Sequence, residues 1–406
     1  GTTKTTIDKI SQPYWLVEPH TTGKFNIPIE SVGFPNNPDY PTVSFTFKVN
    51  DERITLDRKI KQRFVDPVHG ELYDPLVVLP PLTVETASEF VLARNKTEQT
   101  IELTFTRHDS LLDDFTVTIE PISGWKLSTN SFNLVFGQEN TLTCTLTVKP
   151  LSDTREIAVV RFKYNNKALH HIKTLAYDHI PSITWFPTSA ISLQNITLEN
   201  PVQHIGYLAG AGDLVAESLQ KIGMNVTYLS EKDLNLHNLK KYDAIVVGVR
   251  YFNISKNGSA TLRKLLEYAY EGGVVLSQYT VNNKLSTDKL GPYEFGLSRS
   301  RVTQEDAKVS LDKNDPSLNF PNKITEADFE GWIQERGLYF AENIDKKYRT
   351  PLTMNDNGEQ PHKGSLLITS SGKGKFVYAS LAFFRQLPAG VPGAYRLFVN
   401  LLTNEK

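Results

Sequence analysis

The sequence predicts a multidomain chain, with two antiparallel β-sandwiches followed by a doubly wound α/β domain. Two observations lead to this fold class. Apolar and polar residues alternate through much of the first 180 positions, and from about residue 205 near-continuous apolar runs alternate with helical patterns. Period-2 alternation is typical of half-buried antiparallel strands, whereas fully apolar strands between helices are typical of a parallel sheet covered on both faces.

Five segments of the first half carry the strand pattern. They combine alternation with β-branched and aromatic residues, and they are Tyr40–Val49, Ile101–Thr106, Phe115–Glu120, Thr141–Val148 and Ile157–Tyr164. The dipeptide at positions 80 and 81 is Pro-Pro, which stops strand pairing because proline cannot donate a ladder hydrogen bond. We therefore predict one sandwich over residues 1–80 and a second over residues 81–180.

In the second half, strand and helix patterns alternate along the chain. The expected strands are Ile205–Ala209, Val226–Leu229, Ala244–Val249 and a run that begins at Gly273, with helices between them. A polar insertion over about residues 281–345 interrupts the pattern. It resumes with an edge hairpin, Ser365–Thr369 and Phe376–Leu381, and a closing helix over Ala394–Leu402. This order predicts an α/β, flavodoxin-like, three-layer domain over residues 181–406.

Composition limits the classes of function. A net charge of −1 over 406 residues gives no electrostatic reason to expect nucleic acid or an anionic membrane as a partner. No apolar run approaches the roughly 18 residues of a membrane span. Cys144 is the single cysteine and the histidines are scattered, so we expect no disulfide, no metal and no cofactor. The chain opens with Gly-Thr-Thr, and we interpret it as the later part of a longer protein.

The stretch Gly206–Asp213 has the outline of a phosphate-binding turn. Its glycines do not follow the G-x-G-x-x-G spacing, and no Gly-Lys-Ser/Thr follows. We expect Asp213 to cap the next helix, where its carboxylate would also repel a phosphate. Ser277 lacks the flanking glycines of a nucleophile elbow. Asp213, Gln278 and Tyr279 are therefore predicted to line a ligand cleft and not to carry out a reaction.

The polar insertion contains the densest group of ligand-binding candidates. Trp332, Gln334, Glu335 and Arg336 combine a large ring with amide and charged groups. Such a mixture favours a carbohydrate or another polar ligand, because rings stack while polar groups hydrogen-bond hydroxyls. The alternative is a loop anchored by Trp332 and Tyr339, with an ion pair between Glu335 and Arg336.

A second group of candidates follows the last strand. Arg385 and Gln386 are expected to face the ligand, because open α/β sheets bind ligands at the carboxyl ends of their strands. Arg396 is expected to be structural. If the domain were itself an enzyme, Glu335 or His362 would serve as the acid or base, and Arg385 would orient the substrate.

Five long segments resemble a known family over nearly the whole chain. They are PYWLVEP, DPVHGELYDPLVVLPP, GYLAGAGD, DFEGWIQERGLYF and GKFVYASLAFFRQLPAGVPGAYRLFVNL. Together they are similar to the C-terminal region of long bacterial PIG-L/LmbE-type deacetylases. The second half also resembles the class I glutamine amidotransferase-like superfamily, in particular its ThuA-like branch. Residues 81–150 resemble the Ig-like domain of some glycoside hydrolases. The resemblance implies two Ig-like sandwiches and a periplasmic or secreted protein.

The reactions of these families do not transfer to this chain. The zinc-dependent deacetylases carry a His-Pro-Asp-Asp motif in an N-terminal domain, and that motif is absent here. Amidotransferases need a cysteine elbow, and the corresponding position reads Leu276-Ser277-Gln278. The resemblance thus implies a non-catalytic accessory region that binds a carbohydrate or packs on the deacetylase domain of the same polypeptide. An independent saccharide-acting hydrolase or isomerase and a pure interaction scaffold are the alternatives.

Overall fold

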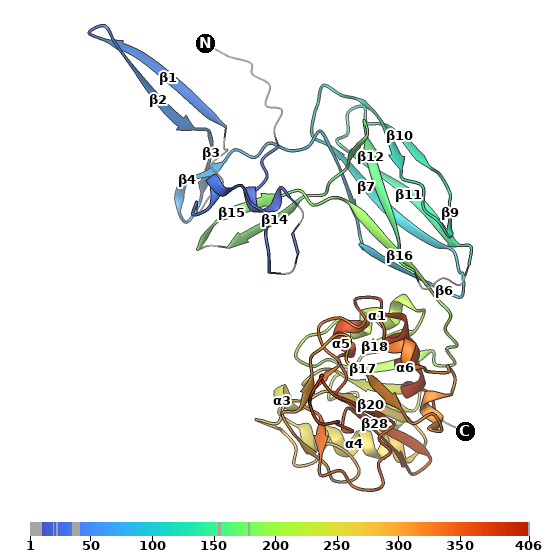
Figure 1. The fold of residues 1–406 in the computed structure, drawn as a ribbon. Coiled ribbons are helices and arrows are strands. Elements are labelled where there is room, and N and C mark those ends of the chain that lie inside the picture. The colour runs from blue at the N-terminus through green and yellow to red at the C-terminus, as the bar shows by residue number, and fades with distance from the viewer. Residues whose placement is uncertain are drawn as a thin grey trace. The chain divides into compact units, whose positions relative to one another are not determined.

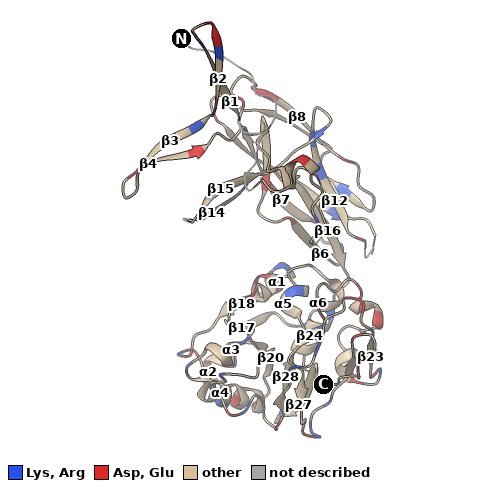
Figure 2. Cartoon of the chain, turned by 60° about the vertical axis from the view of Figure 1, so that its left-hand side comes forward, with Lys and Arg blue, Asp and Glu red and all other residues tan. Residues whose placement is uncertain are grey.

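The computed structural model describes residues 10–18, 20–21, 23–34, 41–152, 156–177 and 179–404 (Figure 1). The chain divides into two compact units. Unit 1 comprises Gly1–Val91, Glu98–Lys149 and Ala158–Ser192, and unit 2 comprises Leu92–Thr97, Pro150–Ile157 and Leu193–Lys406. Basic and acidic residues are interspersed along the ribbon of each unit (Figure 2), in keeping with the near-zero net charge.

A β-sandwich accounts for most of unit 1. One sheet has the order β5-β7-β11-β9, formed by Leu82–Thr86, Gln99–Arg107, Thr141–Pro150 and Trp125–Leu127. The other has the order β10-β8-β12-β16-β6, formed by Ser131–Val135, Asp114–Ile119, Ala158–Tyr164, Ala190–Ile196 and Phe90–Arg94, with β13 (Lys167–Ala168) beside β12. Phe105 of the first sheet meets Phe162 of the second edge-on, and burial along β8 alternates residue by residue. The period-2 pattern therefore specifies these strands.

The segment from residue 41 to residue 80 forms two separate hairpins. β1 (Thr42–Val49) pairs with β2 (Glu52–Lys59), and β3 (Lys61–Asp66) pairs with β4 (Gly70–Pro75). A third hairpin joins β14 (Lys173–Tyr177) to β15 (Ile180–Trp185). Every residue of β1 and β2 is exposed. Within the described residues no second sheet covers these hairpins, so the predicted sandwich over residues 1–80 is wrong; residues 1–9 and 35–40 lie outside the description.

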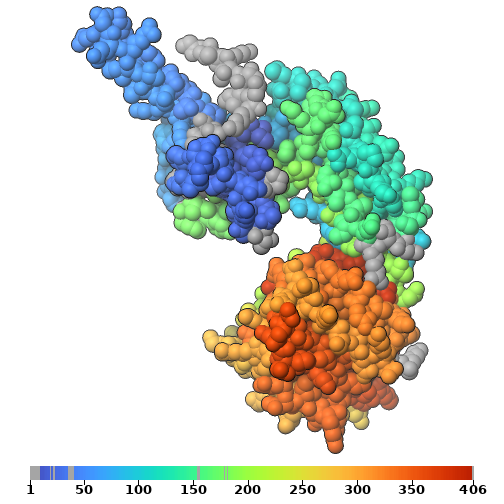
Figure 3. Space-filling view, viewed as in Figure 1, coloured from blue at the N-terminus to red at the C-terminus, as the bar shows by residue number. Residues whose placement is uncertain are grey.

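Unit 2 is built on a six-stranded sheet with the order β18-β17-β19-β20-β28-β27. The strands are Asn225–Tyr228, His204–Leu208, Ala244–Val247, Val274–Gln278, Gly374–Ala379 and Leu366–Ser371. They run parallel except β27, which pairs antiparallel with β28. The apolar runs of β19 and β20 are fully buried, as expected for strands covered on both faces. In the space-filling view, unit 2 forms one compact body (Figure 3).

The helices of unit 2 are few and mostly short. They are α1 (Val215–Lys221), α2 (Leu236–Leu239), α3 (Tyr251–Ile254), α4 (Gly258–Tyr270), α5 (Phe383–Gln386) and α6 (Pro392–Leu402). α4 packs on β20, β27 and β28, and α6 packs on β20. Gly393, in the first turn of α6, lies so close to Asp328 that a Cβ atom would collide with the Asp328 carbonyl oxygen. The start of α6 is therefore held directly against the backbone at residue 328.

Residues 279–365 contain only short elements. Three two-stranded pairs occur: β21 (Gly296–Leu297) with β25 (Ala341–Glu342), β22 (Arg301–Val302) with β24 (Gly337–Leu338), and β23 (Val309–Leu311) with β26 (Leu352–Met354). Two 3₁₀ turns, η3 (Pro316–Leu318) and η4 (Glu326–Phe329), lie between them; η1 (Tyr14–Leu16) and η2 (Ile29–Ser31) belong to unit 1. The predicted polar insertion is thus a folded segment with its own buried residues.

The predicted fold class, two sandwiches followed by a flavodoxin-like three-layer α/β domain, is wrong. Of the described residues, 39% are in strands and 15% in helices, so the chain is mostly β with many small sheets. Four-residue helices are too short to cover a sheet face, and residues 279–373, all of them described, contain no α-helix between β20 and β28. Repeated apolar strands were interpreted as repeated β–α units, although α4 is the one helix of more than two turns between strands of this sheet.

Candidate functional site

Three aromatic rings meet beyond the carboxyl end of β20. Tyr279 directly follows β20, and its ring centroid lies 6.3 Å from that of Tyr339, with the planes 19° apart. The Phe384 centroid lies 5.2 Å from that of Tyr279. All three side chains are half-buried, and they come from the end of β20, the residue after β24, and α5. We call Tyr279, Tyr339 and Phe384 the aromatic platform.

An arginine–carboxylate pair borders the platform. Arg385 Nε donates to Glu335 Oε1 at 2.7 Å, and the guanidinium lies 5.0 Å from the centroid of the Phe384 ring. The Arg385 side chain is 36% exposed and that of Glu335 is 13% exposed. Among the described residues, the two terminal nitrogens of Arg385 have no hydrogen-bond partner. They can therefore donate to a ligand, since a guanidinium carries five N–H groups.

Gln386 fixes the segment that carries Glu335. Its Oε1 accepts from the backbone N–H of Ile333 at 2.8 Å, and its Nε2 donates to the carbonyls of Ile333 and Glu335 at 2.9 and 3.2 Å. The side chain is fully buried. Gln386 was predicted to face a ligand, and that prediction is wrong, because its amide is used inside the protein. It positions Glu335 beside Arg385.

Three non-glycine residues around the platform have left-handed backbone conformations. Arg250, Gln334 and Tyr339 have φ angles of 58°, 63° and 55°. The Arg250 N–H donates to the Tyr279 carbonyl at 2.8 Å, which ties the residues after β19 and β20 together. Such conformations cost about 1–3 kcal/mol each and collect at functional sites. Their grouping here marks the region around Tyr279 as a candidate site.

The charges around Tyr279 act on its hydroxyl group. Burial raises the pKa of Tyr279 above its usual value of 10.0, and Glu335 raises it further, whereas Arg250 and Arg385 lower it. At neutral pH the hydroxyl is protonated and can donate a hydrogen bond.

The Asp213 carboxylate accepts hydrogen bonds from groups inside the protein. The Tyr207 hydroxyl donates to Asp213 Oδ1 at 2.5 Å, and the backbone N–H groups of Val215 and Val249 donate to its two oxygens at 3.0 and 3.2 Å. Gln278 Nε2 donates to the Tyr207 oxygen at 3.2 Å. Burial and the neighbouring Asp213 carboxylate raise the pKa of Tyr207. Asp213 thus ties the start of α1 to the end of β19, which leaves it little capacity for a ligand.

Other polar groups at the end of β20 are buried without a partner. The Ser277 hydroxyl, the Gln278 amide oxygen and the Thr280 hydroxyl are all inaccessible and make no hydrogen bond in the described structure. Ser277 is 1% exposed, so a substrate cannot reach it as a nucleophile.

Trp332 and Arg336 are core residues, and their predicted role in ligand binding is wrong. Trp332 is 2% exposed, and its indole N–H donates to the Asp328 carbonyl at 2.9 Å. Arg336 is 4% exposed and donates to the carbonyls of Ala307 and Phe329. The alternative ion pair between Glu335 and Arg336 is also absent, because Glu335 pairs with Arg385. Backbone carbonyls satisfy the buried guanidinium in place of a carboxylate.

The remaining candidates lie apart from one another. His362 exchanges backbone hydrogen bonds with Met354, and its ring meets Phe340 edge-on at 5.8 Å. Within the described structure it makes no hydrogen bond or ion pair with Glu335, so the two do not form an acid–base couple. Gln334 is exposed next to Glu335, and its backbone N–H donates to Glu305. Of the predicted residues, Tyr279, Glu335 and Arg385 come together at the platform.

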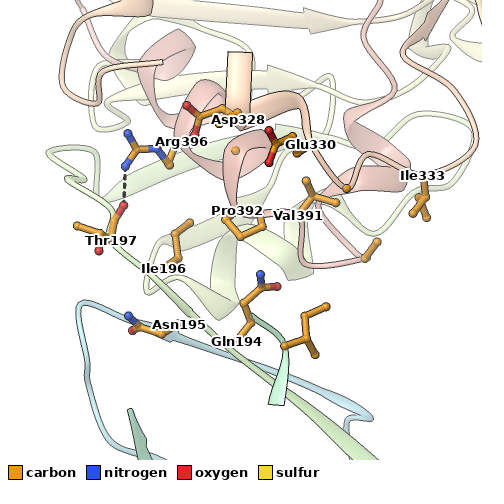
Figure 4. Close-up of a pocket in the computed structure, with 15 residues that line it drawn as sticks. Gln194, Asn195, Ile196, Thr197, Asp328, Glu330, Ile333, Val391, Pro392 and Arg396 are labelled. Carbon is orange, nitrogen blue, oxygen red and sulfur yellow. Dashed lines mark hydrogen bonds and ion pairs between the residues drawn. The ribbon is translucent and has the colours of Figure 1, made fainter. Parts of the chain in front are cut away.

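A separate hollow of about 440 Å³ also lies in unit 2 (Figure 4). Arg396 reaches both Asp328 and the backbone of Thr197 at its wall (Figure 4). Arg396 Nε donates to Asp328 Oδ1 at 2.9 Å, and its terminal nitrogens donate to the carbonyls of Thr197 and Lys323. All three nitrogens of this guanidinium are hydrogen-bonded inside the protein.

Comparisons with known proteins leave the family of the chain open. No protein-family model and no curated protein matches it. Among solved structures it is similar to a cold-adapted β-galactosidase from Rahnella sp. R3, with a TM-score of 0.30, 12% identity, and coverage of 51% of this chain and 32% of that one. A β-galactosidase from Bacillus circulans sp. alkalophilus is similar with a TM-score of 0.30 and 12% identity, over 47% of this chain and 31% of that one. An exo-β-1,4-mannosidase from Opitutaceae bacterium strain TAV5 has a TM-score of 0.29 and 11% identity, over 50% of this chain and 37% of that one.

The matched region corresponds to about a third of each of these glycosidases. Scores at this level do not establish a shared fold.

The described residues contain no group of three or more His, Cys, Asp or Glu side chains able to hold a metal ion. None of the described helices has the length and hydrophobicity needed to cross a membrane.

The sequence interpretation missed Arg250 and Phe384, and it named Tyr339 only as a loop anchor. Arg250 comes just after the apolar strand Ala244–Val247, so the carboxyl-end rule applied to Arg385 would have found it. Phe384 and Tyr339 lie in segments that drew attention for other residues. No sequence pattern indicates that both rings lie against Tyr279, because they follow it by 60 and 105 positions (339 − 279 and 384 − 279).

Proposed function

We propose that unit 2 binds a carbohydrate through the aromatic platform. Half-exposed rings beside an arginine with unused donors suit a sugar, because its C–H face packs on an aromatic ring while its hydroxyls accept hydrogen bonds. Tyr279 and Arg385 supply these two kinds of contact within one cluster. The exposed cluster of rings next to the Glu335–Arg385 pair is the observation that carries this function.

We propose further that the chain is a non-catalytic accessory region of a larger N-acetyl sugar deacetylase, periplasmic or secreted. The sequence resemblance supports the deacetylase, and the burial of Ser277 together with the engagement of Glu335 by Arg385 supports a binding role without catalysis. The β-sandwich would act as a spacer. In a full-length deacetylase, Tyr339→Ala should slow deacetylation of a polymeric substrate and leave a soluble monosaccharide unaffected. Equal slowing with both substrates would contradict the accessory role.

Titration calorimetry on the complete chain tests carbohydrate binding directly. A panel of neutral and acidic oligosaccharides should contain at least one ligand, and Tyr339→Ala should weaken its binding about tenfold or more, since a central aromatic anchor is lost. Tyr270→Ala is the matched control, because Tyr270 is 63% exposed on α4. Equal affinity in the two variants, or no binding across the panel, would refute the proposal.

A further inference from the structure

Arg250 is placed beside the platform by its own backbone. It follows β19, adopts a left-handed conformation and donates its N–H to the Tyr279 carbonyl at 2.8 Å. The residue is exposed. This backbone bond joins Arg250 to the residue that supplies the central ring of the platform, and the Arg250 charge lowers the pKa of Tyr279.

The positive charge of Arg250 is not neutralised. Within the described part of the chain, no Asp or Glu oxygen lies within 4.0 Å of its guanidinium, whereas Arg385 is paired with Glu335. The platform therefore carries one uncompensated positive charge, on a side chain free to approach a ligand.

The conformation of Arg250 is costly for an arginine. Left-handed backbone is cheap for glycine and tolerable for asparagine, but it costs other residues about 1–2 kcal/mol. The structure therefore has an arginine where a smaller residue would be more stable. A function for the guanidinium would account for this choice.

We infer that the ligand of the platform is an anionic saccharide, and that Arg250 binds its carboxylate or sulfate group. A guanidinium matches both groups through paired N–H donors. The sugar ring would pack on Tyr279 and Tyr339, with Arg385 donating to its hydroxyls. This inference rests on the proposed carbohydrate-binding function and specifies its ligand class.

The test compares three oligosaccharides by titration calorimetry on the complete chain: an oligogalacturonate, a sulfated oligosaccharide and a neutral galactose oligomer. The wild-type protein should bind at least one acidic oligomer about tenfold or more tightly than the neutral one. Arg250→Asn should remove most of this preference and retain binding of the neutral oligomer. Added salt should weaken acidic binding in the wild-type protein more than in the variant.

The controls separate the inference from the function on which it rests. Arg263→Gln removes an exposed arginine from α4 and should change nothing. Asn tolerates left-handed backbone, so Arg250→Asn should remain folded; Arg250→Gln is the second variant, with a more similar side-chain length. If both variants keep the acidic preference, the inference fails while carbohydrate binding stands. If no oligosaccharide binds the wild-type protein, the proposed function itself fails.

Discussion

Two arginine–carboxylate pairs join the same two segments of unit 2, yet they differ in what their arginines do. Arg396 uses Nε on Asp328 and its terminal nitrogens on two backbone carbonyls. Arg385 uses only Nε, on Glu335. Asp328 is 3% exposed and also accepts from the backbone and side chain of Thr325, whereas Glu335 is 13% exposed.

The difference separates a structural pair from a binding pair. A guanidinium whose three nitrogens all bond to groups inside the protein mainly stabilises the fold. One that retains free donors at the surface beside aromatic rings can bind. The sequence shows two arginines eleven positions apart (396 − 385), and only the surrounding hydrogen bonds distinguish them.

The largest effect should come from breaking the buried pair. Asp328→Ala leaves the Arg396 guanidinium without a counter-charge and removes the acceptor for Thr325, so the free energy of unfolding should fall by about 3 kcal/mol. Urea unfolding followed by fluorescence measures this, with Trp332 as the single tryptophan of unit 2. A loss no larger than that of a surface substitution would contradict the structural role of the pair.

Gln386→Ala should be the next most damaging change. It leaves the Ile333 N–H and the Glu335 carbonyl without their partner and removes one of the two donors to the Ile333 carbonyl, which should cost about 2 kcal/mol of unfolding free energy. It should also weaken saccharide binding, because Glu335 and Arg385 lose their fixed separation. Gln220→Ala, at an exposed position of α1, is the control for both measurements. Lost stability with unchanged binding would show that Gln386 does not position the pair.

Glu335→Gln should barely affect stability. Partly exposed ion pairs contribute about 0–1 kcal/mol, because water already solvates both groups. The same urea experiment therefore contrasts this variant with Asp328→Ala. A loss of stability close to that of Asp328→Ala would mean that the two pairs are equivalent, and it would remove the distinction on which the binding site rests.

The smallest effects concern the Tyr279 hydroxyl. Its folded-state pKa lies above the usual 10.0, so the stability linked to the protonated phenol is present below pH 10 and is lost as the pH rises through the folded-state value. Arg250→Gln should raise this pKa further, and Glu335→Gln should lower it. Absorbance titration at alkaline pH, with Tyr279→Phe subtracted, measures both shifts. Shifts of the opposite sign would show that these charges do not act on Tyr279.

Local patterns in the sequence located individual strands well. Phe115–Glu120 and Ala244–Val249 were predicted as strands and correspond to β8 and β19 within two residues at either end. Alternation and apolar runs report how a strand is covered, and this depends on the residues of the strand itself. They do not report what covers it, which explains why the hairpins of residues 41–75 were predicted as a sandwich.

The candidate site was harder to predict because the sequence does not show whether a polar residue is exposed to a ligand or buried and hydrogen-bonded inside the protein. Trp332 and Arg336 looked like ligand contacts, but backbone carbonyls satisfy both of them inside the core. Every residue carries a backbone carbonyl, so the sequence cannot show which carbonyl will accept from a buried side chain. Glu335 and Arg385 were identified by residue type and by position after a strand, whereas their pairing depends on Gln386, which sequence alone does not reveal.

The close approach of Gly393 to Asp328 bears on how the protein could be engineered. Any side chain at position 393 would push α6 away from the Asp328 backbone, and α5, which carries Arg385, is followed by α6 after only five residues. Randomised libraries aimed at new ligand selectivity should therefore leave residues 385–396 fixed. Position 250 is a better choice for randomisation, because asparagine and glycine fit its left-handed backbone at least as well as the arginine they would replace.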